Sequence, residues 1–269
     1  MRGIGINLAG KDFPEQERIK LVKETGFDTV FFDYKEEETD CLIETSRNNG
    51  LIVDSIHAPF GKINSFWENT AETDSYYSLM IRIIDCCSKN GVGKLVMHTT
   101  VGNHPPAVNN DGLIRYKAMC DYAKEKNVHI CFENLEPFPH FHSVMEYIRD
   151  YHGFCWDCGH NLCYTPHVDM MRLYSDRLMC LHLHDNKGVT QPGNIDYRDD
   201  LHMLAFDGVL DWQWTAKKIA ESNYKGPLTF EYSNRTVNSC SHLTYKQFLQ
   251  TAYERAVKFR EMVDFAETL

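Results

Sequence analysis

Short runs rich in β-branched and aromatic residues alternate with longer amphipathic segments along the whole chain. Eight such runs have the character of strands, at residues 3–8, 28–33, 51–57, 94–98, 128–133, 153–157, 177–184 and 227–232. Segments with helical periodicity separate them, at residues 15–25, 39–48, 73–90, 112–126, 143–150, 211–222 and 245–265, with a weaker helix at 168–174. This alternation predicts a parallel sheet, because each helix carries the chain back to the start of the next strand.

Eight strand–helix units in 269 residues predict a closed (β/α)8 barrel, the TIM barrel, as a single domain over residues 1–269. Gly26, Gly50 and Gly91 follow three of the predicted helices, as C-terminal caps require. The alternative is an open, doubly wound sheet, which usually carries a Gly-rich phosphate-binding loop after its first strand. That place reads NLAGKDFPE here and lacks the loop, so the barrel is favoured.

Charge and apolar content exclude several classes of protein. The net charge is −10, with 38 acidic and 28 basic residues, which disfavours a broad nucleic-acid surface. No stretch approaches the roughly 18–20 apolar residues of a membrane helix, and the opening MRGIGINLAGKDF has no secretory apolar core. We therefore expect a cytoplasmic protein whose 10 cysteines are mostly buried, reduced thiols. Cys155 and Cys158 form a C-x-x-C without a second pair, which makes redox chemistry a poor explanation.

Six of the predicted strands end on, or close to, a potential metal ligand. In chain order these are His57, His98, Glu133, Asp157, His182 and Glu231. A single such residue has a structural explanation, as a hydrogen-bonded histidine or as the N-cap of the next helix. Six at the same end of a barrel do not, because each buried charge costs several kcal/mol to desolvate unless it is paired. Imidazoles and carboxylates suit zinc or manganese, so the pattern predicts a metal site.

Further polar and aromatic residues lie on the loops that follow these strands. His160 stands three residues after Asp157, and Asp200 and His202 form a D-x-H on the long loop after the seventh strand. Two aromatic residues after the third strand could shape a substrate pocket, and three basic residues on the last two loops could bind a phosphate. They are Phe60 and Trp67, and Lys187, Arg198 and Arg235. Packing and solvated surface charge are the structural alternatives for these five.

Several short motifs resemble the xylose isomerase-like barrels, which include sugar-phosphate isomerases and epimerases and endonuclease IV. The motifs are HAPF at 57–60, ENL at 133–135, DCGH at 157–160, HLHD at 182–185 and DLHMLAFDGVLDW at 200–212. The resemblance implies that one divalent ion is held by Glu133, Asp157, His182 and Glu231, as in the sugar-converting members. It also implies additional ligands of the kind that hold three zinc ions in endonuclease IV. Those positions are His57, His98, His160, Asp200 and His202.

Other stretches favour the sugar-converting members over endonuclease IV. NLEPFPHFHS after Glu133 looks like the isomerase-like members, and TTVGNHPP after His98 departs from the usual proline-glycine. The early loops offer only Lys11 and Lys62 in place of the basic groove that a DNA-binding surface needs.

The resemblance therefore predicts a metal-dependent sugar or sugar-phosphate isomerase or epimerase that works through a metal-stabilised enediolate. Glu133 and Glu231 would transfer the protons, while His160, Phe60, Trp67, Lys187 and Arg198 would bind the substrate. The expected cofactor is zinc or manganese, as one ion and at most three. The expected partner is a small sugar or sugar phosphate, and association into a homo-oligomer is common among such barrels. The alternative is a multi-zinc phosphodiesterase acting on abasic DNA. A ligand-binding barrel without turnover is disfavoured, because a mere binder needs no pair of opposed carboxylates.

Overall fold

Eight parallel strands form the inner layer of the protein. The computed structural model describes residues 1–8, 13–135, 137–191, 195–234 and 240–269. Neighbours in the sheet follow the order β7-β6-β5-β4-β3-β2-β1-β8. The strands are β1 (Ile4–Asn7), β2 (Thr29–Asp33), β3 (Ile52–His57), β4 (Lys94–Met97), β5 (His129–Glu133), β6 (Gly153–Asp157), β7 (Leu178–His182) and β8 (Leu228–Phe230).

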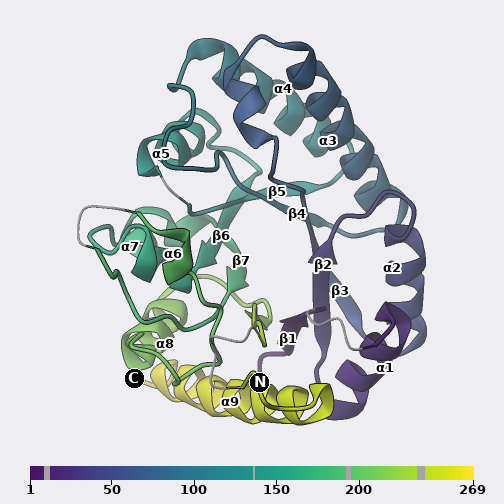
Figure 1. Cartoon of the computed structure of the whole chain (residues 1–269), viewed down its shortest axis with the longest axis vertical. Coiled ribbons are helices and arrows are strands. Elements are labelled where there is room, and N and C mark those ends of the chain that lie inside the picture. Colours follow the sequence, from purple (N-terminus) through teal and green to yellow (C-terminus); the bar gives the residue numbers. More distant parts are fainter. Residues whose placement is uncertain (9–12, 136, 192–194, 235–239) are drawn as a thin grey trace.

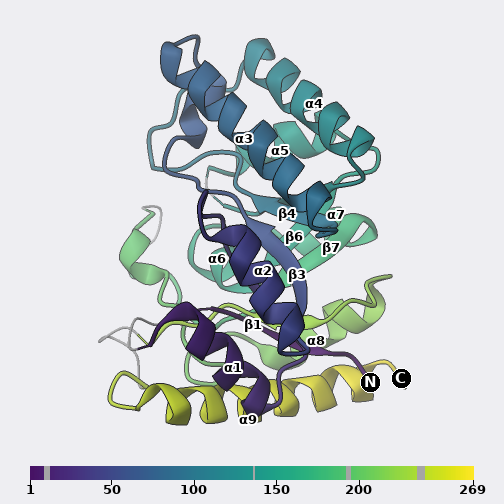
Figure 2. The ribbon, with the colours of Figure 1, turned by 90° about the vertical axis from the view of Figure 1, so that its right-hand side faces the viewer.

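Helices surround this sheet on its outer side (Figure 1). The longer ones are α1 (Glu15–Thr25), α2 (Thr39–Asn48), α3 (Ala71–Lys89), α4 (Asn110–Glu125), α5 (Phe138–Tyr147), α8 (Trp212–Glu221) and α9 (Tyr245–Ala266). Short helices are α6 (Cys158–Cys163), α7 (Met170–Tyr174) and the 3-10 turns η1 (Ile63–Trp67), η2 (Ser175–Arg177) and η3 (Tyr197–Asp199). Figure 2 shows α1 and α2 side by side in front of the strands. None of the helices in the described ranges is long and apolar enough to cross a membrane.

The sheet curves until β7 and β8 meet, which nearly closes the barrel. Their contact is one parallel bridge between Leu183 and Phe230, just beyond the end of β7. The Leu183 amide donates to the Thr229 carbonyl over 3.0 Å, and the Glu231 amide donates to the Leu183 carbonyl over 3.1 Å. The predicted (β/α)8 TIM barrel is therefore confirmed.

The ends of the helices follow the sequence signals closely. Thr70 and Thr244 each form a capping box, at the N-termini of α3 and α9. Gly26, Gly50 and Gly91 have φ angles of 118°, 76° and 60°, so they adopt the left-handed conformation predicted for caps.

Some predicted elements differ from the observed ones. Helix α5 begins at Phe138 rather than at residue 143, since a proline in the first turn removes only an N–H that has no helical partner. Strand β7 ends at His182, two residues before its predicted end. Helix α6 was not predicted at all. It starts directly after β6 because Asp157, the last strand residue, accepts a hydrogen bond from the His160 amide and caps it.

A layer of thiols lies beneath the ligand-bearing ends of three adjacent strands. Cys131, Cys155 and Cys180 cluster with Val96, and each stands two residues before a predicted ligand at the end of its strand. Residues two apart on a strand point to the same side, so this layer supports the ligands from below. The cysteines in the structure are reduced, and only Cys41 is exposed and Cys86 half-buried, which confirms the prediction of buried thiols.

Candidate metal centre

The carboxyl ends of the strands bring the predicted metal ligands into three adjoining groups. In each group, one ligand atom from every residue lies within 4.8 Å of the others. The first group is Glu133, Asp157, His182 and Glu231, the second is His57, His98 and Glu133, and the third is His160, His184, Asp200 and His202. Glu133 belongs to two groups and therefore joins them. All nine predicted ligands are in these groups, together with His184, which was not predicted.

The first group centres on His182. Its Nδ1 lies 3.0 Å from Oε1 of Glu133 and 3.1 Å from Oε2 of Glu231. The ring stacks on Phe31 of β2 at a centroid distance of 4.4 Å, which fixes its orientation. Burial lowers the pKa of His182, but the two carboxylates outweigh burial and raise that pKa well above its usual value. The group therefore concentrates negative charge around one nitrogen.

Asp157 is held in place by the residue that follows Glu133. The side-chain amide of Asn134 donates to the Asp157 carbonyl over 2.8 Å, and its oxygen accepts from the Asp157 amide over 2.8 Å. This double hydrogen bond ties the end of β5 to the end of β6. Asn134, the asparagine of the ENL motif, is thus a positioning residue. It was not singled out in the sequence analysis.

The second group surrounds the other oxygen of Glu133. Nε2 of His57 lies 3.0 Å from Oε2 of Glu133, and Nε2 of His98 lies 3.1 Å from it. Burial alone raises the pKa of Glu133, but the imidazoles of His182 and His98 outweigh it and hold that pKa well below its usual range. Glu133 is therefore an ionised carboxylate, only 1% exposed and surrounded by ring nitrogens.

The hydrogen bonds of His57 point to a cation between the ring and Glu133. Its Nδ1 lies 2.8 Å from the Ala58 carbonyl, which can only accept, so Nδ1 carries the proton of the neutral ring. The lone pair of Nε2 then faces the Glu133 carboxylate at 3.0 Å, an arrangement that needs a proton or a metal ion between them. Histidines that bind metals typically donate the other N–H to a carbonyl in this way.

Ligand spacing also fits a metal. Two ligand atoms on one tetrahedral zinc ion lie about 3.3 Å apart, given metal–ligand bonds of about 2.0–2.1 Å. Contacts of comparable length between ring nitrogens and carboxylate oxygens occur in all three groups, for example 3.0 Å at Glu133, 3.1 Å at Glu231 and 3.4 Å between His160 and Asp200. The described residues therefore fit divalent cations.

His184 is the residue that sequence reasoning missed in the third group. Its Nε2 lies 2.9 Å and 3.0 Å from the two oxygens of Asp157, and its ring stacks on His202 at 4.1 Å. The HLHD motif contained the signal, because His182 and His184 are two residues apart and so point to the same side of an extended chain. A Cβ on Gly159 would lie 2.1 Å from the His184 ring, which explains the glycine of DCGH.

The mouth of the barrel is open beside Glu231. A cavity of about 380 Å³ is lined there by Phe31, Asp33, Lys35, His202 and Glu231, among others. The Glu231 side chain is 22% exposed, against 1% for Glu133, so it is the core ligand nearest to solvent. A small polar molecule could approach the centre from this side.

Of the two aromatic residues predicted to bind substrate, Phe60 is exposed and Trp67 is buried. Phe60 is 44% exposed at the mouth and stacks on His98 at 4.6 Å. Trp67 is buried in η1, where its Nε1–H donates to the Thr99 carbonyl and its ring packs against Tyr116. The prediction that Trp67 binds substrate is therefore corrected to a packing role, because its polar atom and its faces are already occupied.

Two of the three predicted phosphate ligands, Lys187 and Arg198, do not line the mouth cavity. Lys187 is exposed on the loop after β7. Arg198 is 85% exposed on its side chain and pairs with Asp196 through two of its nitrogens. Arg235 and Lys11 lie outside the described residues, and the Lys62 side chain is exposed and pairs with Glu72.

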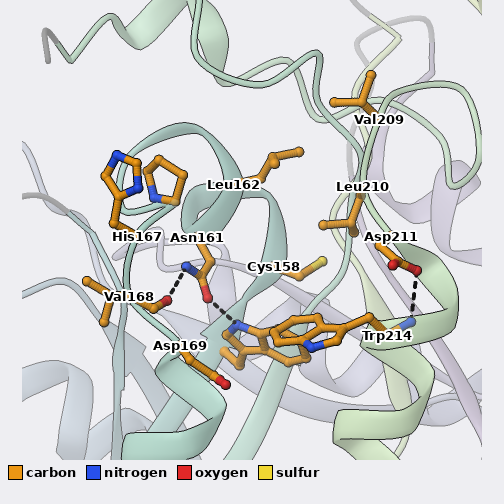
Figure 3. Close-up of a pocket in the computed structure, with 12 residues that line it drawn as sticks. Cys158, Asn161, Leu162, His167, Val168, Asp169, Val209, Leu210, Asp211 and Trp214 are labelled. Carbon is orange, nitrogen blue, oxygen red and sulfur yellow. Dashed lines mark hydrogen bonds between the residues drawn. The ribbon is translucent and has the colours of Figure 1, made fainter. Parts of the chain in front are cut away.

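A second cavity, of about 410 Å³, lies on the other side of α6. Figure 3 shows Cys158, Asn161 and Leu162 from α6 facing it, with Trp214 from α8. None of the metal-group residues lines this cavity. Helix α6 thus presents His160 to the ligand groups, and Cys158, Asn161 and Leu162 to a pocket outside the barrel.

The chain belongs to the xylose isomerase-like TIM barrel family, whose pattern matches residues 19–265. It is 30% identical over 207 residues to the protein y4fM of Sinorhizobium fredii, covering 71% of this chain and 62% of that protein. The chain thus spans less than two thirds of the length of that relative.

Solved structures share the fold at low sequence identity. A D-psicose 3-epimerase from Clostridium cellulolyticum H10 matches with a TM-score of 0.78 at 12% identity, over 97% of this chain and 99% of that one. A family protein from Mycobacterium smegmatis in complex with magnesium matches with a TM-score of 0.66 at 14% identity, over 99% and 98%. A fusion of such a barrel with a 4-hydroxyphenylpyruvate dioxygenase matches with a TM-score of 0.77 at 14% identity, over 97% of this chain and 43% of that one.

Proposed function

We propose that this protein is a metal-dependent isomerase or epimerase of a sugar or sugar phosphate. The supporting observation is the first group, in which Glu133 and Glu231 both lie about 3 Å from Nδ1 of His182. A divalent cation held by this group would act as a Lewis acid on the carbonyl oxygen of a substrate. Zinc and manganese both suit the oxygen and imidazole ligands. Sugar 3-epimerases among the structural matches support the same chemistry.

The two glutamates would move the protons. The pKa of Glu231 is raised by burial but lowered more strongly by His202 and His182, so the carboxylate is ionised and able to accept a proton. It lines the mouth cavity, where the carbon next to a substrate carbonyl would lie. Glu133 is ionised, so it would first take up a proton from solvent or from a substrate hydroxyl and then return that proton to the other face of the same carbon. The predicted contact between His160 and a substrate hydroxyl does not enter this scheme, because His160 is only 5% exposed and its Nδ1 and Nε2 already face the Asn134 carbonyl and Asp200.

A second candidate function is cleavage of a phosphodiester in abasic DNA. The observation that favours it is the presence of three adjoining ligand groups, since several metal ions can together activate water and stabilise a leaving oxygen. The net charge of −10 opposes it, because such an enzyme must bind a polyanion.

Hydrogen exchange from solvent tests the first function. The metal-loaded protein is incubated in deuterated water with a panel of ketoses and ketose phosphates, and deuterium next to the carbonyl is measured by NMR. We expect incorporation with at least one sugar, and a loss of at least about 10²-fold in Glu231→Gln, which keeps the shape of the side chain but removes the base. Glu146→Gln, on the exposed side of α5, is the matched control and should exchange normally.

The outcomes separate the two candidates. Absence of exchange with the whole panel, from protein whose metal content is verified, would reject the isomerase. Incision of an abasic duplex by the same preparation would then establish the second candidate.

A further inference from the structure

The third ligand group contains one more side chain than the family resemblance implies. That resemblance supplies His160, Asp200 and His202 as ligands, and the fourth member is His184. We infer that these four residues form a closed, tetrahedral zinc site of the structural type, separate from the catalytic ion. The inference does not depend on the proposed function, because it concerns coordination and stability rather than turnover.

Three imidazoles converge on the Asp200 carboxylate. Nε2 of His202 lies 3.0 Å from Oδ2, Nε2 of His160 lies 3.4 Å from Oδ2, and Nε2 of His184 lies 3.9 Å from Oδ1. The rings of His184 and His202 are stacked, and the ring of His160 is nearly perpendicular to both. Nitrogens from three directions therefore surround one carboxylate, as ligands around a single ion do.

Two of these rings are already oriented as metal ligands. Nδ1 of His202 lies 3.1 Å from the Glu231 carbonyl, and Nδ1 of His160 lies 3.2 Å from the Asn134 carbonyl. Each carbonyl accepts a hydrogen bond from the Nδ1–H of its ring, so in the neutral ring the lone pair of Nε2 is directed at Asp200. Without a cation, these lone pairs would face a carboxylate.

His184 completes the group from inside the barrel. It is fully buried, held between the Gly159 backbone and the His202 ring, and its Nδ1 has no partner among the described residues. Its Nε2 lies 2.9 Å from Asp157 and 3.9 Å from Asp200. A buried imidazole confined to that position can donate to Asp157 or bind a cation beside Asp200, and the latter also relieves the charge of both carboxylates.

The backbone at His202 is strained in a way that serves this group. Its φ angle is 50°, a left-handed conformation that is unfavourable for a residue other than glycine. The next residue, Met203, pairs with Asp185 in an antiparallel bridge. The strain turns the imidazole inward against the end of β7, and a bound ion would compensate for its cost.

Four protein ligands have a chemical consequence. Structural zinc sites use four protein ligands, whereas catalytic sites keep one position open for water or substrate. An ion held by this group would therefore generate no nucleophile. It would instead attach the segment that carries Asp200 and His202 to α6. This role differs from that of a third metal used for phosphodiester cleavage.

Metal content and cobalt spectroscopy test the inference without any activity assay. The chain is stripped with a chelator, reloaded with Zn²⁺ or Co²⁺, and measured by elemental analysis and visible absorption. We expect wild type to hold one more zinc per chain than His184→Gln or Asp200→Asn, and to show the intense bands of tetrahedral Co²⁺ that both variants lose. Weak octahedral bands alone in the wild-type protein would overturn the inference, even if neither variant folds.

Two further comparisons separate a ligand from a residue that only orients Asp157. His184→Gln can still donate to Asp157, so unchanged zinc content and cobalt bands in this variant would overturn the inference. His152→Gln is the matched control, because His152 is also buried and, among the residues that the structure describes, its ring nitrogens bond to backbone atoms. It should lower the Tm of apo and zinc forms equally, whereas His184→Gln should reduce the rise in Tm that zinc produces.

Discussion

Two buried histidines of this protein, His152 and His57, have different hydrogen-bonding patterns, and each pattern requires a different state of the ring. His152 has backbone partners on both ring nitrogens: Nε2–H donates to the Cys120 carbonyl, and Nδ1 accepts from the Ile130 amide. His57 has a backbone carbonyl on one nitrogen and the Glu133 carboxylate on the other. The first pattern requires a neutral imidazole, and the second requires a proton or a metal ion.

We predict that His152 makes the fold sensitive to acid. Burial lowers the pKa of His152 to about 4, against 6.5 for a free imidazole. Between these values the unfolded chain binds a proton that the folded chain does not. The neutral His152 ring therefore contributes fully to the free energy of unfolding above pH 6.5. This contribution decreases as the pH falls to 4, by up to about 3 kcal/mol.

Urea unfolding at several pH values between 7.5 and 4.5 measures this effect. The free energy of unfolding should fall more steeply with decreasing pH in wild type than in His152→Gln, by up to one proton per chain. Equal slopes in the two proteins would show that His152 is protonated in the fold.

At the scale of single elements, the contact between η1 and α4 reverses the effect on stability that replacing a helix glycine with alanine usually has. Gly112 lies in the first turn of α4, where alanine would ordinarily stabilise the helix by up to about 1 kcal/mol. A Cβ there would lie 2.2 Å from the Trp67 ring. That ring is buried and hydrogen-bonded to Thr99, so it has little room to move.

Gly112→Ala should therefore destabilise the protein, by about 1–3 kcal/mol, as overpacking does. Thermal or chemical unfolding measures the change. Gly93→Ala provides the comparison, because no atom lies within 4 Å of the added Cβ, and it should be close to neutral. Stabilisation by Gly112→Ala would mean that the Trp67 ring is free to move.

The loop between β7 and α8 is organised by one buried carboxylate. Asp185 accepts hydrogen bonds from the Trp212 indole over 2.8 Å and from the Leu210 amide over 2.9 Å. A Cβ on Gly208 would lie 2.2 Å from the Asp185 side chain. Much of the motif DLHMLAFDGVLDW therefore holds the loop in shape, so that Asp200 and His202 are presented to the centre.

At the scale of the whole molecule, the joint between β7 and β8 is the weakest part of the sheet. Only a single bridge connects these strands, whereas β2 and β3 pair over five positions. His182 and Glu231 lie on opposite sides of this joint and both contribute to the first ligand group. A divalent ion there would close the barrel covalently on one side.

Metal loading should therefore slow amide hydrogen exchange at the joint. The amides of Leu183 and Glu231, which bond across it, should exchange faster in the apo protein than those of β2 and β3. Addition of zinc should protect them by at least about tenfold, corresponding to roughly 1.4 kcal/mol of local stabilisation. Uniform protection across all strands would instead indicate a global effect of binding.

The architecture, and most of the residues that the structure gathers into the three candidate ligand groups, could be predicted from the sequence for one reason. Strand and helix periods are local properties, and parallel strands in a barrel all end on the same face. A His or Glu at the end of a predicted strand, such as His57 or Glu133, can therefore be assigned to that face before its neighbours are known.

The tertiary structure alone decided what each residue does at that face. His184 entered the third group and Trp67 became part of the packing, because side-chain contacts depend on how β7, α6 and the loops approach one another. The start of α6 likewise depended on Asp157 capping the helix in place. Periodicity determined which end of the barrel carries the chemistry, whereas the partition of ten side chains into three ligand groups is a matter of distances that only the closed barrel defines.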